Sequence, residues 1–409
     1  MGIVSTELLL IILCSLIVLS YLFSIASRVI RVPSVLLLLF AGMAFRFLSK
    51  AYDFFVPIPM QLVEGLGVVG LIMIVLEAGL DLKLERSKMG LIRNSFFSAL
   101  IILLVSTALV TTILYYWLHE NVVKCLIYAM PLSIMSSSIV IPSIHHLTQQ
   151  KKEFLIYEAS FSDILGILFF NYLVAGELLS LQSVVFFSLS LIVSIVFSVI
   201  LSFALLLILA RTHLNIRFFL IFSLLILIYS GGKLMHLPSL LIIMIFGLMI
   251  NNWEKIKIPI LNKLFPSRQV ASIATLLHSI TAESSFLVRT FFFILFGYTI
   301  DLSFLQEGEV WLVGSLIVAV LFLIRFLYLR FFVHTNVFPE TFFIPRGLIT
   351  IVLFYKIPAV QKLTSFNDGI LFFVILSTGL ILSLGMIFTK SSVEEVIDAP
   401  QFSEHKETI

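Results

Sequence analysis

Two acidic residues, Glu158 and Asp163, stand five positions apart inside an otherwise apolar stretch. Asp163 lies nine residues into the predicted span 154–176, about 13 Å deep at ~1.5 Å per residue, so it falls near the middle of a bilayer. No Lys or Arg lies within ten residues of it along the chain. Because a charge at that depth costs at least ~2.5–3.5 kcal/mol, we expect Asp163 to hold a proton or a cation, as in a proton-coupled transporter. The alternative is a protonated Asp that packs against another helix.

The elements that must position these residues are membrane-spanning helices. The chain has 409 residues, of which 60% are hydrophobic and only 12% charged, and its mean hydropathy is +1.15. Apolar runs long enough to cross a bilayer recur from end to end. This composition excludes soluble, disordered and nucleic-acid-binding classes, so no nucleic-acid partner is expected. The runs are continuous rather than alternating, which excludes an outer-membrane barrel.

We therefore predict an all-α polytopic membrane protein with about thirteen transmembrane helices. The predicted spans are 6–27, 33–48, 62–80, 94–117, 123–145, 154–176, 181–210, 216–232, 238–251, 285–303, 309–331, 339–358 and 368–389. The longest predicted loop, 252–283, contains an amphipathic stretch at 270–278 that we expect to lie along the inner surface.

Basic residues divide unevenly between the two sets of loops. One set carries most of the Lys and Arg, including Lys151 and Lys152. The opposite set carries only Lys50, Lys233 and Lys362, with Arg46, Lys124 and Lys356 at helix ends beside it. The positive-inside rule then predicts a multi-pass protein of the plasma (inner) membrane, with its N-terminus outside and its C-terminus in the cytoplasm.

Two spans are interrupted by residues that break helices. In the fifth, Pro131 and Pro142 bracket three serines; in the twelfth, Pro345 precedes Arg346 and Gly347. Such breaks free backbone carbonyls at mid-depth, and Arg346 could offset the helix-end dipoles there. The alternative is serine-mediated helix packing with an arginine that extends toward the interface.

The two broken spans occupy corresponding places in the two halves of the chain, and each precedes an intact span. This pattern predicts inverted repeats, with the binding site between two discontinuous helices. The predicted first repeat is 1–176 (helices 1–6), the linking helix 181–210, the second repeat 216–389 (helices 8–13), and the short cytoplasmic tail 390–409.

Three other charged residues inside the spans need partners. Arg325 lies at a depth similar to that of Glu158, so the two could pair, and Arg289 is the competing partner. A pair with Glu158 would be structural and would orient the helix that carries Asp163. Glu77, near the cytoplasmic end of the third span, either lines an inner vestibule or extends to the interface.

Several motifs together resemble the monovalent cation:proton antiporter superfamily, which contains the sodium/proton exchangers, over nearly the whole chain. The most specific is Glu158-x-x-x-Ser162-Asp163, which is similar to the family's Glu-x-x-x-Asn-Asp motif on the sixth helix. Four further motifs resemble family signatures: Gly70–Leu82 on the third helix, Phe291–Leu302 on the tenth, Phe322–Arg325 on the eleventh, and Pro345-Arg346-Gly347 on the broken twelfth.

The resemblance implies a homodimer in the lipid bilayer, with a scaffold domain and a six-helix core that moves like an elevator and in which the two discontinuous helices cross. It implies Asp163 as the carboxylate that binds the monovalent cation and the proton, and Glu158–Arg325 as the core salt bridge. Ser162, Ser137 and Ser138 would complete the ion site, and Arg346 and Glu77 would support it. The transported species would be H⁺ and Na⁺, K⁺ or Li⁺, and no cofactor is expected.

The sequence departs from the family pattern at the ion site. Ser162 stands where electroneutral members usually carry Asn, and Ala159 where a Ser is often found. The Thr-Asp-Pro common at the fifth-helix break falls at Ser137-Ser138-Ile139, so one carboxylate is missing. With one free carboxylate we expect electroneutral exchange of one cation for one proton, with sodium favoured over potassium.

Three alternatives remain to the exchanger interpretation. A monovalent cation channel would use the serines of the broken fifth span as a filter, and a transport-impaired homologue would follow from the missing carboxylate. An intramembrane transferase would need a catalytic or metal-binding cluster at one interface. Only His145 and His146 come close to such a cluster, so we expect no enzyme.

Overall fold

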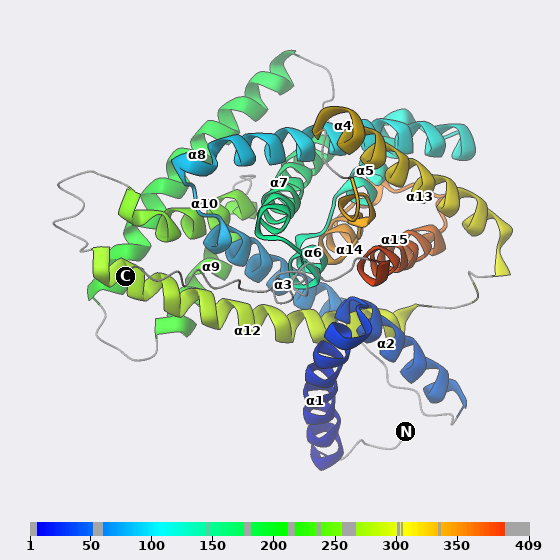
Figure 1. Cartoon of the computed structure of the whole chain (residues 1–409), viewed down its shortest axis with the longest axis horizontal. Coiled ribbons are helices and arrows are strands. Elements are labelled where there is room, and N and C mark those ends of the chain that lie inside the picture. The colour runs from blue at the N-terminus through cyan, green and yellow to red at the C-terminus, as the bar shows by residue number, and fades with distance from the viewer. Residues whose placement is uncertain are drawn as a thin grey trace, which may run out of the picture.

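The computed structural model describes residues 6–51, 60–144, 147–175, 181–211, 217–234, 239–255, 267–300, 303, 306–333 and 337–388. His145, His146 and the predicted tail 390–409 lie outside these residues. The secondary structure of the described part is helical throughout, with short connections (Figure 1).

Seven helices fall in the first half of the chain. They are α1 (Thr6–Ile30), α2 (Ser34–Ala51), α3 (Met60–Asp81), α4 (Met89–Leu118), α5 (Val122–Ser133), α6 (Ser137–Ser143) and α7 (Gln149–Val174). Local signals explain some of their ends. After α4, His119 adopts the left-handed conformation that commonly ends helices, with φ 52°. The Asn121 side chain accepts a hydrogen bond of 2.8 Å from Val123 N and so begins α5.

Seven more helices follow in the second half. They are α8 (Leu181–Arg211), α9 (Arg217–Leu234), α10 (Ser239–Asn251), α12 (Ser267–Thr299), α13 (Gly308–Tyr328), α14 (Leu348–Tyr355) and α15 (Asp368–Phe388). Short turns lie between them: η1 (Arg86–Lys88) before α4, η2 (Trp253–Lys255) after α10, the π-turn η4 (Leu329–Val333) after α13, η5 (Glu340–Phe342) before α14 and η6 (Ala359–Gln361) after it.

The prediction of an all-helical, multi-span protein is confirmed. When α5 and α6 count as one interrupted span, and η5 and α14 as another, the described helices match the thirteen predicted spans one for one. Within the described residues, six segments are long and apolar enough to cross a membrane by themselves: Ser34–Ala51, Arg86–Leu118, Val122–Ser143, Val270–Thr299, Gly308–Val333 and Asp368–Phe388.

The prediction for 252–283 is wrong over its second half. The amphipathic stretch 270–278 is not a separate surface helix but the first part of α12, which continues unbroken from Ser267 to Thr299. Val270, Ile273 and Leu277 recur at helical spacing and are buried. No Pro or Gly interrupts this helix before Gly297, so nothing local separates the stretch from the span that follows it.

The helices pack into two groups. We call α4, α5, α6, α7, α13, η5, α14 and α15 the broken-helix group, because its members pack chiefly on one another and it holds both interrupted spans. We call α1, α2, α3, α8, α9, α10 and α12 the flanking group, in which α12 lies along α2 and α3, and α10 lies along α3 and α8 (Figure 1). The main packing between the two groups is α3 against α14 and α7 against α10.

Close helix packing in the flanking group depends on glycine. A Cβ atom on Gly79 of α3 would lie 2.6 Å from the backbone oxygen of Met244 in α10. The backbones of the two helices can therefore approach more closely than any side chain would allow, as is common for small residues between membrane helices.

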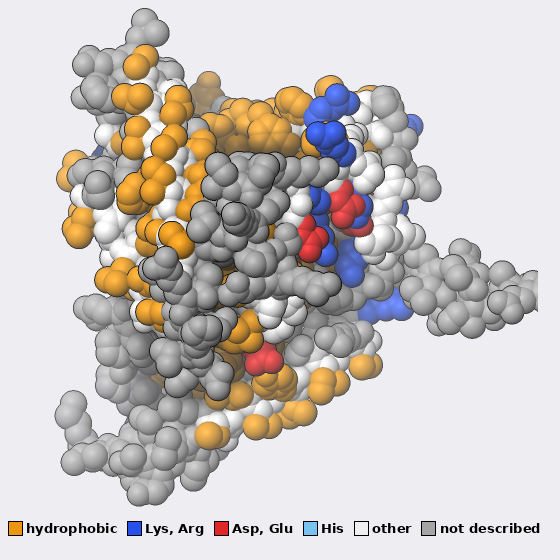
Figure 2. Space-filling view, turned by 90° about the vertical axis from the view of Figure 1, so that its left-hand side faces the viewer, with side chains coloured by type: hydrophobic (Ala, Val, Ile, Leu, Met, Phe, Trp, Pro, Cys, Tyr) orange, Lys and Arg blue, Asp and Glu red, His pale blue; other side chains and the backbone are white. Residues whose placement is uncertain are grey.

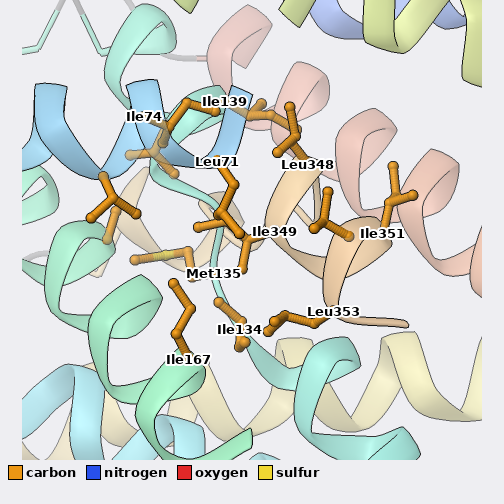
Figure 3. Close-up of a cluster of buried hydrophobic side chains, with 14 of the residues drawn as sticks. Leu71, Ile74, Ile134, Met135, Ile139, Ile167, Leu348, Ile349, Ile351 and Leu353 are labelled. Carbon is orange, nitrogen blue, oxygen red and sulfur yellow. The ribbon is translucent and has the colours of Figure 1, made fainter. Parts of the chain in front are cut away.

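An apolar cluster surrounds the interrupted spans (Figure 3). It collects side chains of α3, α6, α7 and α14 around the extended segment that joins α5 to α6: Leu71, Ile74, Ile134, Met135, Ile139, Ile167, Leu348, Ile349, Ile351 and Leu353. At the surface, by contrast, Figure 2 shows hydrophobic side chains at the left, the top and the lower margin of one face, while the visible Lys and Arg gather on its right-hand side. Basic residues that gather away from apolar surface are typical of a membrane-spanning protein.

Candidate functional site

The two interrupted spans cross each other at their non-helical segments. Ser136 N donates a hydrogen bond of 2.9 Å to Pro345 O, which joins the first break directly to the second. A Cβ atom on Gly347 would lie 2.6 Å from Ser136 Oγ, so a larger residue here would displace the Ser136 side chain. The crossing satisfies backbone groups that lipid could not satisfy, which is the condition for non-helical backbone at membrane depth.

Asp163 lies beside this crossing, on α7. Its side chain is buried, with 3% exposure, and its Oδ2 accepts a hydrogen bond of 3.2 Å from Ser137 N at the beginning of α6. Within the described residues, Asp163 Oδ1 and Ser137 Oγ are buried without a hydrogen-bond partner. Buried polar atoms are usually paired, and of the eight unpartnered side-chain atoms in the described structure these two lie on residues that are in direct contact.

Ser162 and Ser138 bind the crossing rather than the carboxylate. Ser162 Oγ accepts a hydrogen bond of 3.0 Å from Met135 N, which holds the extended segment against α7. The Ser138 hydroxyl lies 2.8 Å from the Ser136 hydroxyl. Of the three serines expected at the ion site, the structure therefore places Ser137 against Asp163, whereas Ser162 holds the neighbouring backbone and Ser138 contacts the Ser136 side chain.

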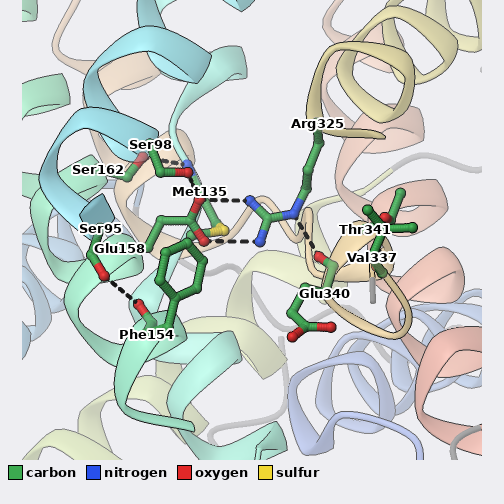
Figure 4. A network of polar contacts seen from close by, with 10 residues as sticks. All are labelled: Ser95, Ser98, Met135, Phe154, Glu158, Ser162, Arg325, Val337, Glu340 and Thr341. Atoms are coloured by element: carbon green, nitrogen blue, oxygen red, sulfur yellow. Dashed lines mark hydrogen bonds and ion pairs between the residues drawn. The ribbon is translucent and has the colours of Figure 1, made fainter. Parts of the chain in front are cut away.

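Glu158 and Arg325 form a two-point ion pair (Figure 4). Arg325 Nη2 lies 2.9 Å from Glu158 Oε2 and Nη1 lies 3.1 Å from Oε1, and each residue is only 1% exposed. Ser98 donates a third hydrogen bond, of 2.5 Å, to Glu158 Oε1. Parallel charge-assisted bonds of this kind are among the strongest side-chain contacts and fix orientation as well as distance.

Depth alone did not identify the partner of Glu158, and the structure places Arg289 elsewhere. Helix α7 begins at Gln149, five residues before the predicted start of the span, so Glu158 lies about 14 Å along the helix from that end. Arg289 lies on α12, where its Nη1 donates to Ser138 O at 3.1 Å. Its Nη2 lies 3.9 Å from Glu77 Oε2, which makes Glu77 its acidic neighbour.

Arg346 binds the free carbonyls where helices end at the crossing. Its Nε and Nη2 donate to Leu132 O and Ser133 O, the last residues of α5, at 2.8 and 3.1 Å. Its Nη1 donates to Ile344 O at 2.5 Å, in the extended segment after η5. The guanidinium is buried and places positive charge where unpaired carbonyls concentrate negative charge.

Sequence reasoning missed one backbone-directed contact, one serine side chain and one side-chain pair. Arg325 Nε donates to Glu340 O at 2.7 Å, so the same guanidinium also binds the second interrupted span (Figure 4). Ser98 has no sequence signal, because a serine in an apolar span is common. His278 Nε2 of α12 lies 2.7 Å from Asp81 Oδ1 of α3. This pair was not predicted, because residues 270–278 were expected to form a separate surface helix.

The chemistry available at the crossing is that of one carboxylate among oxygen atoms. The described residues contain no group of three or more His, Cys, Asp or Glu that could hold a metal ion. One carboxylate with neighbouring hydroxyl and carbonyl oxygens suits a hard cation of low charge, or a proton, rather than a tightly held divalent ion.

Comparisons with known proteins concern the chain as a whole. The family model described as sodium/hydrogen exchanger, transmembrane, matches residues 14–390. The structure of the sodium proton antiporter MjNhaP1 from Methanocaldococcus jannaschii at pH 8 is similar, with a TM-score of 0.67 and 20% identity over 92% of this chain and 96% of that one. An electron microscopy map of the same antiporter gives a TM-score of 0.66 and 17% identity, over 99% and 100%. No curated protein matches the sequence. At these identities, the likeness to the solved structures shows a shared fold.

Proposed function

Because the chain belongs to the sodium/hydrogen exchanger family, we propose that it exchanges one monovalent cation for one proton across the membrane. The observation that carries this proposal is a pair of oxygen atoms, Asp163 Oδ1 and Ser137 Oγ. Both are buried, and neither has a hydrogen-bond partner among the described residues. Their position beside the crossing gives a small cation two oxygen ligands. Backbone carbonyls freed by the breaks are further candidates.

Exchange follows from competition for one carboxylate. A proton and a cation each neutralise Asp163, and burial disfavours the bare anion, so the site is loaded with one or the other. If the loaded site crosses the membrane and the empty anionic site does not, each cation that moves one way is matched by a proton that moves back. With Asp163 as the single exchanging carboxylate, this cycle moves no net charge. We propose sodium ahead of potassium as the cation.

The two helix groups supply the moving parts. We propose that the broken-helix group carries Asp163 past the flanking group, as an elevator, while the Glu158–Arg325 pair and Arg346 keep its interior rigid. The packing supports this division, since the most extensive contacts lie within each group. The proposal includes a homodimer, inverted repeats at 1–176 and 216–389, and an external N-terminus.

The test is a flux measurement on purified protein in sealed liposomes that contain a pH-sensitive dye. After a proton gradient is imposed, Na⁺, K⁺ or Li⁺ is added with the membrane voltage either clamped or free. We expect Na⁺ to drive proton movement that is indifferent to voltage, and Asp163→Asn to abolish it. Asp368→Asn, the same chemical change at the start of α15, is the matched control and should retain exchange.

Other outcomes would contradict parts of the proposal. Cation flux without proton movement would indicate a channel. A response that depends on voltage would mean that a second titrating group moves charge together with Asp163. Absence of cation-driven flux at any pH would indicate a transport-impaired homologue, for which the missing fifth-span carboxylate would be the first explanation. Exchange that survives in Asp163→Asn would remove this residue from its role.

A further inference from the structure

Lys356 and Tyr229 connect the two helix groups at the far end of α14. Lys356 directly follows α14 in the broken-helix group, and Tyr229 lies on α9 in the flanking group. Lys356 Nζ donates a hydrogen bond of 2.5 Å to Tyr229 Oη and lies 5.1 Å from the centroid of the same ring. Tyr229 is only 6% exposed, so the contact is sheltered. A charged donor in a sheltered position makes a stronger bond than the same pair in water.

The contact is well separated from the ion chemistry. Helix α14 begins at Leu348 beside the crossing, and Lys356 lies eight residues later, about 12 Å along the helix axis. A change at Lys356 or Tyr229 therefore leaves the ligands around Asp163 in place. The contact instead fixes the position of α14 relative to α9.

Polar contacts of this kind between the two groups are scarce in the described part of the chain. A second is the hydrogen bond of 3.1 Å from Arg289 Nη1 to Ser138 O, close to the crossing. A third, from a neutral donor, joins Tyr157 Oη of α7 to Lys83 O, just after α3, at 2.7 Å. The surface between the groups also has apolar contacts, as where Gly70 of α3 faces Leu348 of α14. Two apolar surfaces can slide past each other with little loss of contact energy, because apolar contacts are not directional. A charged hydrogen bond depends on distance and angle and is therefore lost when its partners move apart.

We propose that Lys356–Tyr229 is a latch that holds the broken-helix group against α9 in the arrangement seen here, and that it opens each time that group moves. This inference rests on the proposed function, since cation exchange is what requires the movement. Loss of one charge-assisted hydrogen bond should shift the equilibrium between the closed and open arrangements about tenfold toward the open one.

The first test measures the arrangement without any transport. Spin labels at Leu234, the last residue of α9, and Val360, just after α14, report the distance between the groups; these positions are 83% and 87% exposed. In lipid nanodiscs, Tyr229→Phe and Lys356→Met should each increase the population at a second distance about tenfold. The control is Trp117→Phe, which removes the 2.5 Å bond from Trp117 Nε1 to Glu309 inside the broken-helix group and should leave the distances unchanged. Identical distance distributions in the wild type and both latch variants would overturn the proposal.

The second test links the latch to exchange. In a background without Cys14 and Cys125, Tyr229→Cys and Lys356→Cys are joined by a short bifunctional maleimide, which should stop exchange. The matched pair Trp117→Cys and Glu309→Cys, joined in the same way, should leave exchange intact because both positions move together. Full exchange in the joined 229–356 protein would refute the latch. If the unmodified protein shows no exchange, the proposed function fails, and the distance measurement still decides whether the latch exists.

Discussion

Arg325 of α13 binds Glu158 of α7 at two points, 2.9 and 3.1 Å, and also donates to Glu340 O at 2.7 Å. One guanidinium thereby joins α7, α13 and the second interrupted span. Glu158 and Asp163 lie on the same helix but point in different directions around it, since five residues correspond to about 140°. The pair therefore anchors α7 while Asp163 remains directed at the crossing.

This arrangement predicts that Arg325→Ala destabilises the protein. Removal of one partner leaves the other charge buried and unpaired, which costs about 3–5 kcal/mol. Thermal unfolding of purified protein in detergent should therefore show a clear fall in the midpoint temperature. Arg330→Ala, an exposed arginine of the following turn, should have little effect.

A second substitution distinguishes loss of the Glu158–Arg325 ion pair from a nonspecific loss of stability. Arg325→Ala combined with Glu158→Gln should recover part of the lost stability, because the uncompensated charge is gone. Equal losses in Arg325→Ala and Arg330→Ala, or no recovery in the double variant, would contradict the importance assigned to the pair.

Much of the fold could be predicted because lipid imposes strong rules on sequence. Apolar runs located the spans, and prolines with Ser136 and Gly347 located both breaks. The prediction of an all-helical protein with about thirteen spans is confirmed. The starts of α7 and α12 were missed, because polar residues such as Gln149 and His278 continue these helices past their apolar segments.

The contacts of the site could be predicted only in part. Depth made both Arg325 and Arg289 candidates for Glu158, since depth does not say which helices are neighbours. The three carbonyls that bind Arg346 belong to the backbone, which no side-chain pattern encodes. The roles of Asp163 and Ser137 in ion binding stay predictions, and the following experiments test them.

Ser137→Ala should weaken cation binding more than it slows turnover. Ser137 Oγ is buried beside Asp163 without a hydrogen-bond partner in the described structure. If it is a ligand of the cation, the substitution removes one of the oxygens that bind the cation. We expect the KM for Na⁺ to rise about five- to tenfold with a smaller change in kcat. Ser143→Ala is the control, because Ser143 Oγ bonds Ile139 O of its own helix at 2.7 Å. The same rise in KM in both variants would remove Ser137 from the proposed ligands.

Arg346→Met should disrupt the crossing rather than the ion chemistry. It leaves carbonyls of Leu132, Ser133 and Ile344 without the donor that now satisfies them, at about 1–3 kcal/mol for each unsatisfied group. Unfolding temperature and exchange rate should therefore fall together. Arg346→Lys should recover only part of both, because an ammonium cannot reproduce the planar fork that reaches several acceptors. A fully stable and active Lys variant would show that positive charge alone is sufficient.

Competition at Asp163 predicts how exchange depends on pH. As pH falls, a larger share of Asp163 is protonated, and a protonated carboxyl does not bind the cation. The apparent KM for Na⁺ should therefore rise as pH falls, by about tenfold per pH unit once the protonated form predominates. The maximal rate at saturating Na⁺ should change much less, since enough cation displaces the proton.

Initial rates over a matrix of pH and Na⁺ concentrations measure both quantities, with Asp368→Asn as the control that should keep the same dependence. A maximal rate that falls with pH while KM stays constant would mean that the proton and the cation bind at separate groups.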